Sequence, residues 1–385
     1  MSGTRIWAAF KNLGLVIGAV VLSLAAVEAG LWAAGSYDEL ASQRLRPSPA
    51  IWERPRNAIE AHRHPDLKRP IEVVYDDDGV RNHGPVATSG KSRIIGFFGD
   101  SFTENRRVED RFSFTSILAG VARGPFTVAN FGVDAYGLDQ NYLRYKKFEH
   151  LDIDTVVYVL CENDLRNLYE TGLTTLDADG RVGFRRPEAN RTLRLLGRLR
   201  VSYLALDAYY QAHAMWRRQF PGSMNFTDRL GRAADKFSGA RRAQRKRLRD
   251  PYAESVVADL LGPAPTAATL ELARKFRAVL ARWRAEVEAR GRRFEIVVLP
   301  RPADAAVGRA LTGLGSADAV YLSDAMADYA GYRFKHDVHW NETGNLAAAE
   351  AIAASPRFGH AFDAERAKFD AVRRAIAAYY AKPAG

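Results

Sequence analysis

The chain has 385 residues, of which 47% are hydrophobic and 26% charged, and this balance is typical of a folded protein rather than a disordered or fibrous one. The single cysteine, Cys161, excludes an intramolecular disulfide and a cysteine-based metal cluster. The net charge of +11 is concentrated between residues 181 and 249, where eighteen Lys and Arg stand against four Asp and Glu. Without a nucleic-acid-binding motif beside it, this basic segment does not predict a nucleic-acid partner.

Residues 13–34 are apolar on every side and, as a helix, would span roughly 33 Å, the thickness of a bilayer core. Arg5 and Lys11 precede this segment, so the positive-inside tendency predicts a cytoplasmic N-terminus. We therefore expect a single-pass anchor in the cytoplasmic membrane, with the rest of the chain on the outer, periplasmic side. A cleaved signal peptide is the alternative, and it too predicts export.

Three regions are expected along the chain: a cytoplasmic tip and anchor (1–35), a linker and lead-in (36–92), and one large domain (93–385). Within the domain, apolar runs rich in Val, Ile and Phe predict buried parallel strands at residues 93–98, 126–131, 154–160, 294–299 and 319–322. Helical patterns separate them, which predicts an α/β fold with a sheet covered on both faces. Residues from about 175 to 290 are read as a basic helical insertion.

Polar motifs follow the first strand and the last. Gly99-Asp100-Ser101-Phe102-Thr103 places a serine hydroxyl at the carboxyl end of a strand, where α/β folds build their sites. Asp337-Val338-His339-Trp340-Asn341 precedes the alanine-rich helix near the C-terminus. Since a serine nucleophile needs an imidazole to accept its proton and a carboxylate to orient that imidazole, these motifs predict a Ser101, His339 and Asp337 triad.

Residues at the ends of the second and third strands can stabilise an oxyanion. A glycine such as Gly132 allows its N–H to approach a ligand closely, and the amide of Asn163 supplies a neutral donor. With the N–H of Ser101 they form the predicted oxyanion hole. Each residue also has a structural interpretation, Gly132 as a turn residue and Asn163 as a helix cap.

These four blocks resemble the SGNH (GDSL-type) hydrolase family, in which Ser, Gly, Asn and His occur in that order. Ser101 in GDSFT, Gly132 in NFGVDAYG, Asn163 in ENDL and His339 in DVHWN match the blocks, and Asp337 matches the acid. The segment 78–81, DGVR, is similar to one that precedes the first block in membrane-anchored members. The resemblance implies a three-layer, flavodoxin-like α/β/α fold that needs no metal or organic cofactor.

The expected function is hydrolysis of an O-acyl ester outside the cytoplasmic membrane through an acyl-enzyme, on an acylated small molecule, lipid or glycan. The Asp-x-His-Trp spacing also resembles periplasmic polysaccharide O-acetyltransferases, so transfer of the acyl group to a sugar hydroxyl by the same triad is the alternative. A non-catalytic, anchored glycan-binding protein is a further hypothesis, but it would require a lost triad.

Overall fold

The computed structural model describes residues 18–31, 33, 53–54, 59–62, 66, 71–76, 78–81, 93–185 and 251–381. The chain divides into two compact units, one of Met1–Ser48 with Glu188–Gln244 and one of Pro49–Pro187 with Arg245–Gly385. All residues that the sequence predicts to be catalytic belong to the second unit.

In the first unit, residues 18–31 are helical. The remainder of the expected anchor at 13–34, apart from residue 33, lies outside the described residues. Within the described parts of the chain, no helix combines the length and the apolar character that a membrane span requires.

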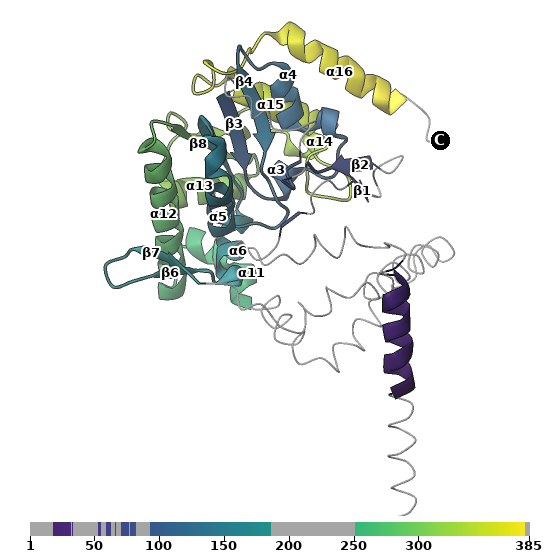
Figure 1. Ribbon diagram of the computed structural model, residues 1–385. Helices are drawn as coiled ribbons and strands as arrows, with labels where there is room; N and C mark the ends of the chain where they lie inside the picture. The colour runs from purple at the N-terminus through teal and green to yellow at the C-terminus, as the bar shows by residue number, and fades with distance from the viewer. Residues whose placement is uncertain are drawn as a thin grey trace, which may run out of the picture. The chain divides into compact units, whose positions relative to one another are not determined.

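Five parallel strands form the sheet of the second unit (Figure 1). In spatial order they are β4 (Phe126–Asn130), β3 (Arg93–Phe98), β5 (Thr155–Leu160), β8 (Arg293–Val298) and β9 (Val320–Tyr321). The five strands predicted from apolar runs are therefore confirmed. The strand order reverses next to β3, as in flavodoxin-like folds, and such sheets bind ligands at the carboxyl ends of the strands beside the reversal.

Helices cover both faces of the sheet. Successive side chains of a strand point to opposite sides, so a strand that is apolar throughout has two apolar faces to bury. In β5, Tyr158 belongs to one apolar cluster and Val157 to the other. The helices that contribute to the first cluster are α5 (Leu138–Phe148), α6 (Asn163–Thr171), α11 (Pro251–Leu261), α12 (Ala267–Glu288) and α13 (Pro302–Thr312). Those of the second include α3 (Ser101–Glu104), α4 (Phe114–Gly120), α15 (Glu342–Ala354) and α16 (Arg366–Ala381). The predicted three-layer α/β architecture is confirmed at this level.

Short elements complete the unit. They are the β1–β2 hairpin (Ile59–His62 and Ile71–Val74), α3 (Ser101–Glu104), η1 (Asp110–Phe112), η2 (Glu149–Leu151), the β6–β7 hairpin (Thr174–Leu176 and Val182–Phe184), η3 (Leu322–Asp324) and α14 (Tyr329–Tyr332). The hairpin β1–β2 lies in the stretch expected to be linker and lead-in. Tyr75, Val80 and Arg81, which follow it, are buried in the second unit, so this part of the lead-in is integral to the fold.

The expected insertion at about 175–290 is described at its two ends. Its first part is the β6–β7 hairpin, which Figure 1 shows beside the end of α12. Its last helix, α12, covers the sheet: Trp283 packs edge-on against Phe98 of β3, with ring centroids 5.5 Å apart. The C-terminal end of the segment is thus part of the sheet-covering layer, and residues 186–250 lie outside the described residues.

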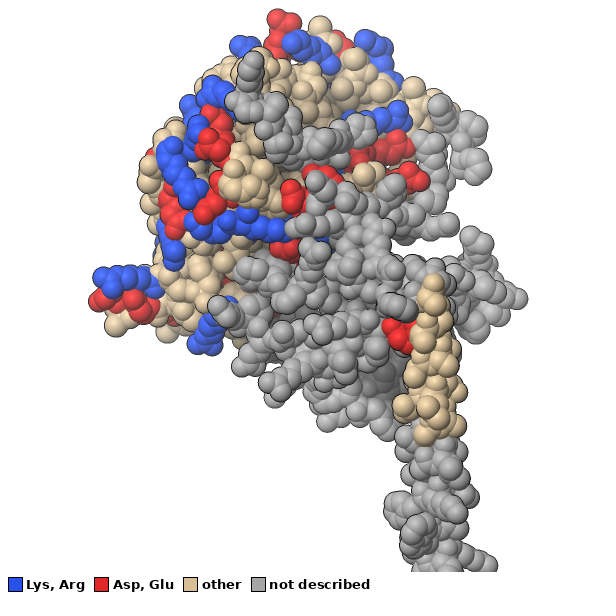
Figure 2. Space-filling model, in the orientation of Figure 1, with Lys and Arg blue, Asp and Glu red and all other residues tan. Residues whose placement is uncertain are grey.

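Basic side chains on the described surface are interspersed with acidic ones on the face shown in Figure 2. On α12, Arg282 Nε lies 2.9 Å from Glu286, and next to the helix Arg290 Nη2 lies 2.8 Å from Glu149. Exposed pairs of this kind contribute little to stability. These ion pairs do, however, compensate the positive charge over α12. Most of the basic stretch 181–249 lies outside the described residues.

Candidate active site

Ser101 lies where β3 ends and α3 begins, at the carboxyl edge of the sheet. The turn is tight: a Cβ on Gly99 would lie 2.2 Å from Thr103 Oγ1, so the position needs glycine. The Asp100 carboxylate accepts the N–H of Phe102 at 2.9 Å and caps the start of the helix. The Ser101 side chain is thereby fixed at the strand end, where the residue is 6% exposed.

The loop between α14 and α15 brings His339 and Asp337 to Ser101. His339 Nε2 lies 2.7 Å from Ser101 Oγ, and Nδ1 of the same ring hydrogen-bonds to Asp337 Oδ1. Asp337 Oδ1 also accepts the backbone N–H of His339 at 3.1 Å, so a spacing of two residues brings the carboxylate to the ring. Phe102 packs against the imidazole, with ring centroids 4.6 Å apart. The three residues predicted as a triad therefore lie together.

The environment favours a neutral imidazole beside an ionised carboxylate. Burial lowers the pKa of His339, and the nearby positive charge of Arg107 lowers it further, against the opposing effect of Asp337. Burial alone would raise the pKa of Asp337, but the hydrogen bond and charge of His339, followed by those of Arg107, hold it well below its usual range. A neutral His339 can accept the proton of Ser101, and an ionised Asp337 can stabilise the imidazolium that results.

Arg107 is a residue of this site that the sequence reasoning missed. Its Nε donates to Asp337 Oδ2 at 2.6 Å, on the oxygen that does not face His339. The two residues are 230 positions apart in the sequence, so spacing gives no hint of their contact. The available signal was the pair Arg106-Arg107 a few residues after the nucleophile, in a stretch expected to lie near the strand end.

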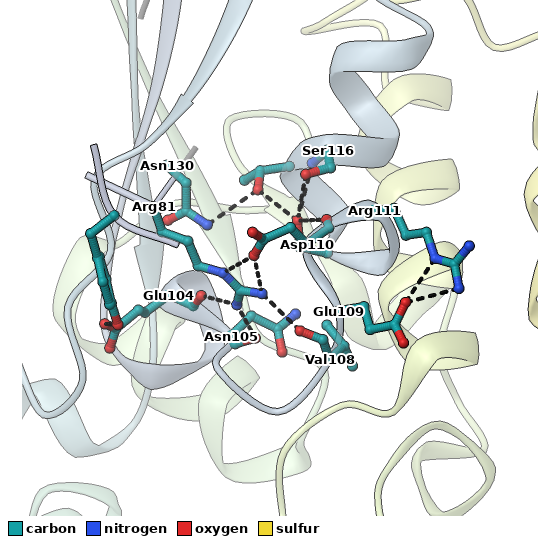
Figure 3. Close-up of polar contacts among 12 residues, drawn as sticks. Arg81, Glu104, Asn105, Val108, Glu109, Asp110, Arg111, Ser116 and Asn130 are labelled. Atoms are coloured by element: carbon teal, nitrogen blue, oxygen red, sulfur yellow. Dashed lines mark hydrogen bonds and ion pairs between the residues drawn. The ribbon is translucent and has the colours of Figure 1, made fainter. Parts of the chain in front are cut away.

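A buried arginine from the lead-in holds the segment between α3 and η1 (Figure 3). The Arg81 guanidinium donates to the carbonyl oxygens of Glu104 at 2.6 Å and Val108 at 2.7 Å. It also hydrogen-bonds to the carbonyl of Asn105, the residue that ends α3 in a left-handed conformation, with φ of 55°. One side chain thus satisfies three backbone carbonyls of the loop that carries Arg107.

Asn163 begins α6 directly after β5, the strand that pairs with β3. Its side chain helps to lower the pKa of Asp100, the residue before the nucleophile, and therefore lies near that carboxylate. Burial raises the pKa of Asp100 to about 6, and the hydrogen bond from the Phe102 N–H together with the nearby Asn163 side chain opposes this rise. The pairing of β5 with β3 brings Asn163 to the same edge of the sheet as Ser101, and its role as an oxyanion donor stays a prediction.

Gly132 differs from its predicted role as an oxyanion donor. Its N–H donates to Asn130 Oδ1 at 3.0 Å and is therefore already engaged within its own loop. A Cβ at Gly132 would lie 2.4 Å from the backbone nitrogen of Glu104 and 2.7 Å from Thr103 Cβ. The requirement for glycine is thus one of packing, since this position lets the loop 131–137 lie against α3.

Ala135, in the same loop, is in the left-handed conformation with φ of 61°, which is unfavourable for a residue with a Cβ. The N–H groups of the neighbouring residues are engaged: that of Asp134 donates to Glu104 Oε2 at 2.7 Å and that of Tyr136 to the Val133 carbonyl at 3.1 Å. Among the described residues, none accepts a hydrogen bond from the Ala135 N–H. Ala135 is an exposed residue, and its N–H is therefore a candidate donor for a ligand.

Neither a protein-family model nor a curated protein sequence matches the chain. The functional interpretation therefore depends on the residues and their geometry.

Proposed function

We propose that the protein is a serine esterase of the SGNH type that cleaves an O-acyl ester through an acyl-enzyme on Ser101. The observation that carries this proposal is the 2.7 Å contact between His339 Nε2 and Ser101 Oγ, with Asp337 on the other ring nitrogen. Nucleophile, base and orienting acid in mutual hydrogen-bond reach are the arrangement on which nucleophilic serine catalysis depends.

In the proposed reaction, Ser101 Oγ attacks the ester carbonyl carbon while its proton moves to His339 Nε2. The tetrahedral oxyanion collapses, the alcohol leaves with the proton from His339, and the acyl group stays on Ser101. Water then attacks the acyl-enzyme, giving a proton to His339. The bond between the acyl carbon and Ser101 Oγ breaks, Oγ takes the proton back from His339, and the carboxylic acid is released. The acyl–oxygen bond of the substrate is thus broken and one water molecule is consumed.

For the oxyanion we propose three donors: the N–H of Ser101, the side-chain amide of Asn163 and the N–H of Ala135. Ala135 replaces Gly132 in this role because the Gly132 N–H is bound to Asn130. The charge of Asp134, adjacent to Ala135, acts on His339, which supports a position of this loop beside the reacting groups.

Acyl transfer to a sugar hydroxyl is the second candidate. The feature that favours it is the Asp337-Val338-His339-Trp340 sequence, whose structure now shows that the short spacing supports the hydrogen bond to the ring. The chemistry differs in the acceptor alone, because a sugar hydroxyl would replace water in the second step.

The test uses the purified full-length chain with p-nitrophenyl esters of short and long acyl chains, with and without a polysaccharide acceptor. We expect ester cleavage and fluorophosphonate labelling by the wild-type protein, and loss of both in Ser101→Ala. Ser316→Ala, which changes an exposed serine outside the site, is the matched control and should behave like the wild type. Labelling that persists in Ser101→Ala would refute the proposed nucleophile, and acylated polysaccharide would favour the transferase.

We also propose that residues 13–34 anchor the enzyme in the cytoplasmic membrane, with the catalytic unit in the periplasm. The support is the apolar sequence and the preceding Arg5 and Lys11. A reporter that is active in the periplasm should function when fused after Gly385, whereas a reporter that requires the cytoplasm should not. The opposite pattern would refute this topology.

A further inference from the structure

Asp337 is held from both sides. Its Oδ1 faces His339, and its Oδ2 accepts the Nε–H of Arg107 at 2.6 Å. The side chains of the three residues are largely enclosed, with exposed fractions of 17% for Arg107, 15% for Asp337 and 12% for His339. Because water screens such a contact much less than a surface pair, Arg107 can affect both the orientation of the acid and the charge of the base.

The loop that carries Arg107 is itself fixed. Arg81 satisfies the carbonyls of Glu104, Asn105 and Val108 on one side of it. On another side the amide of Asn105 hydrogen-bonds to Asn345 of α15, whose Oδ1 also accepts the N–H of Phe114 at 2.9 Å. Arg107 therefore extends toward Asp337 from a backbone that buried hydrogen bonds hold in place. A flexible arginine that pairs with a surface acid lacks such a fixed backbone.

We propose that Arg107 is a positioning residue of the reaction: it fixes Asp337 in the orientation that holds the His339 ring against Ser101. This role rests on the proposed function. It also extends it, since Arg107 belongs to neither the triad nor the oxyanion hole and would act through Asp337.

The charges around His339 give the expected direction of the effect. Arg107, from the loop after α3, lowers the pKa of His339, whereas Asp337, from its own loop, and Asp134, from the loop after β4, raise it. On α3, Phe102 packs on the ring, and the guanidinium of Arg301 lies 5.3 Å from the Phe102 centroid. Removal of Arg107 leaves both acids in place, so the pKa of His339 should rise.

The experiment compares the full-length wild type with Arg107→Gln, Arg107→Lys and the control Arg111→Gln. Arg111 lies on the same segment, is 54% exposed and pairs with Glu109 instead of with the site. Two quantities are measured: the pH dependence of kcat/KM for p-nitrophenyl acetate, and the titration of His339 followed by NMR of the imidazole.

For Arg107→Gln we expect the acid limb of the profile and the His339 titration to move upward together by roughly one pH unit. We also expect a fall in kcat of about tenfold at the optimum, with KM little changed, because a misaligned acid weakens proton transfer. Arg107→Lys keeps the positive charge, so it should retain the wild-type acid limb with a several-fold lower kcat. Arg111→Gln should match the wild type in both measurements.

A purely structural role predicts a different result, in which kcat/KM falls by the same factor at every pH and His339 titrates as in the wild type. That outcome in Arg107→Gln would overturn the proposal. If Arg107→Gln does not fold, Arg107→Lys decides, and wild-type kcat in that variant would overturn it. A wild-type chain without ester cleavage or fluorophosphonate labelling would instead refute the proposed function, and the NMR titration would still test the effect of Arg107 on His339.

Discussion

Arg81 and Asp110 form a buried ion pair, with Nε and Oδ1 2.6 Å apart and with 2% and 7% of their side chains exposed. The pair connects the lead-in to the start of η1, across the loop that carries Arg107. The same guanidinium also donates to backbone carbonyls of that loop (Figure 3). The lead-in therefore supports the residues that follow the nucleophile, although it contributes no group to the proposed chemistry.

Replacement of Arg81 by methionine should strongly destabilise the protein. The change removes the Arg81 guanidinium from the buried Asp110 carboxylate and from the loop carbonyls, and loss of one partner of a buried pair typically costs about 3–5 kcal/mol. Chemical denaturation monitored by circular dichroism measures this change in the free energy of unfolding. The control is Arg111→Met, which breaks an exposed pair with Glu109 and should cost less than about 1 kcal/mol. An equal change in the free energy of unfolding in the two variants would contradict the proposal that Arg81 stabilises the loop after α3.

Replacement of Gly132 by alanine should disrupt the nucleophile helix. The new methyl group would lie 2.4 Å from Glu104 N and 2.7 Å from Thr103 Cβ. Since backbone atoms cannot rotate away, α3 must shift, at a cost of about 1–3 kcal/mol for such overpacking. We expect lower stability together with a large loss of fluorophosphonate labelling at Ser101. Gly120→Ala, at a position with open space around it, should be nearly neutral, and full labelling of Gly132→Ala would show that the loop can yield.

The sequence predicted the sheet and the nucleophile motifs best, because buried strands and strand ends have characteristic residue patterns. Buried parallel strands such as β5 read as continuous apolar runs, and the serine and histidine motifs follow elements whose ends meet at one edge of the sheet. For the same reason the sequence predicts that Asn163, which follows β5, lies at the same edge of the sheet as Ser101, and β5 does pair with β3.

Residue type alone does not indicate the direction of a backbone N–H, so the sequence could not show that the Gly132 N–H hydrogen-bonds to Asn130. The Arg107–Asp337 contact joins residues far apart in the chain, and many arginines in this sequence could have formed it. The position of α12 in the fold could not be predicted from its sequence pattern. A helix that covers the sheet and a helix of an inserted subdomain have the same hydrophobic periodicity. The packing of Trp283 against Phe98 of β3 shows that α12 covers the sheet.

The pH dependence of ester cleavage should reflect the lowered pKa of His339. The base must be neutral to accept the proton of Ser101, so kcat/KM should fall as the pH drops through the pKa of His339. Burial and Arg107 place that pKa below the ordinary value of 6.5, and the protein should therefore keep more of its activity in mildly acidic solution than a base with the ordinary histidine pKa would allow. Initial rates with p-nitrophenyl acetate between about pH 4 and pH 9 measure the profile. An acid limb at or above the ordinary histidine value would contradict this electrostatic interpretation.

The roles of His339 and Asp337 can be separated by single and double substitutions. His339→Ala removes the proton acceptor that lies 2.7 Å from Ser101 Oγ, so turnover should fall by several powers of ten, as for Ser101→Ala. Asp337 acts through the histidine, and Asp337→Asn should reduce kcat by a smaller or at most equal factor, because the amide cannot stabilise the imidazolium.

The double variant should be scarcely slower than His339→Ala, since residues that act as one unit give non-additive losses. The measurement is kcat for p-nitrophenyl acetate, with circular dichroism of each variant to identify misfolded protein. Asp328→Asn, which changes an exposed acid at the start of α14, is the control for loss of a negative charge and should be fully active. Two results would contradict this assignment: kcat losses of His339→Ala and Asp337→Asn that multiply in the double variant, or full activity of Asp337→Asn. In either case Asp337 would only structure its loop and pair with Arg107. Another carboxylate would then have to orient His339.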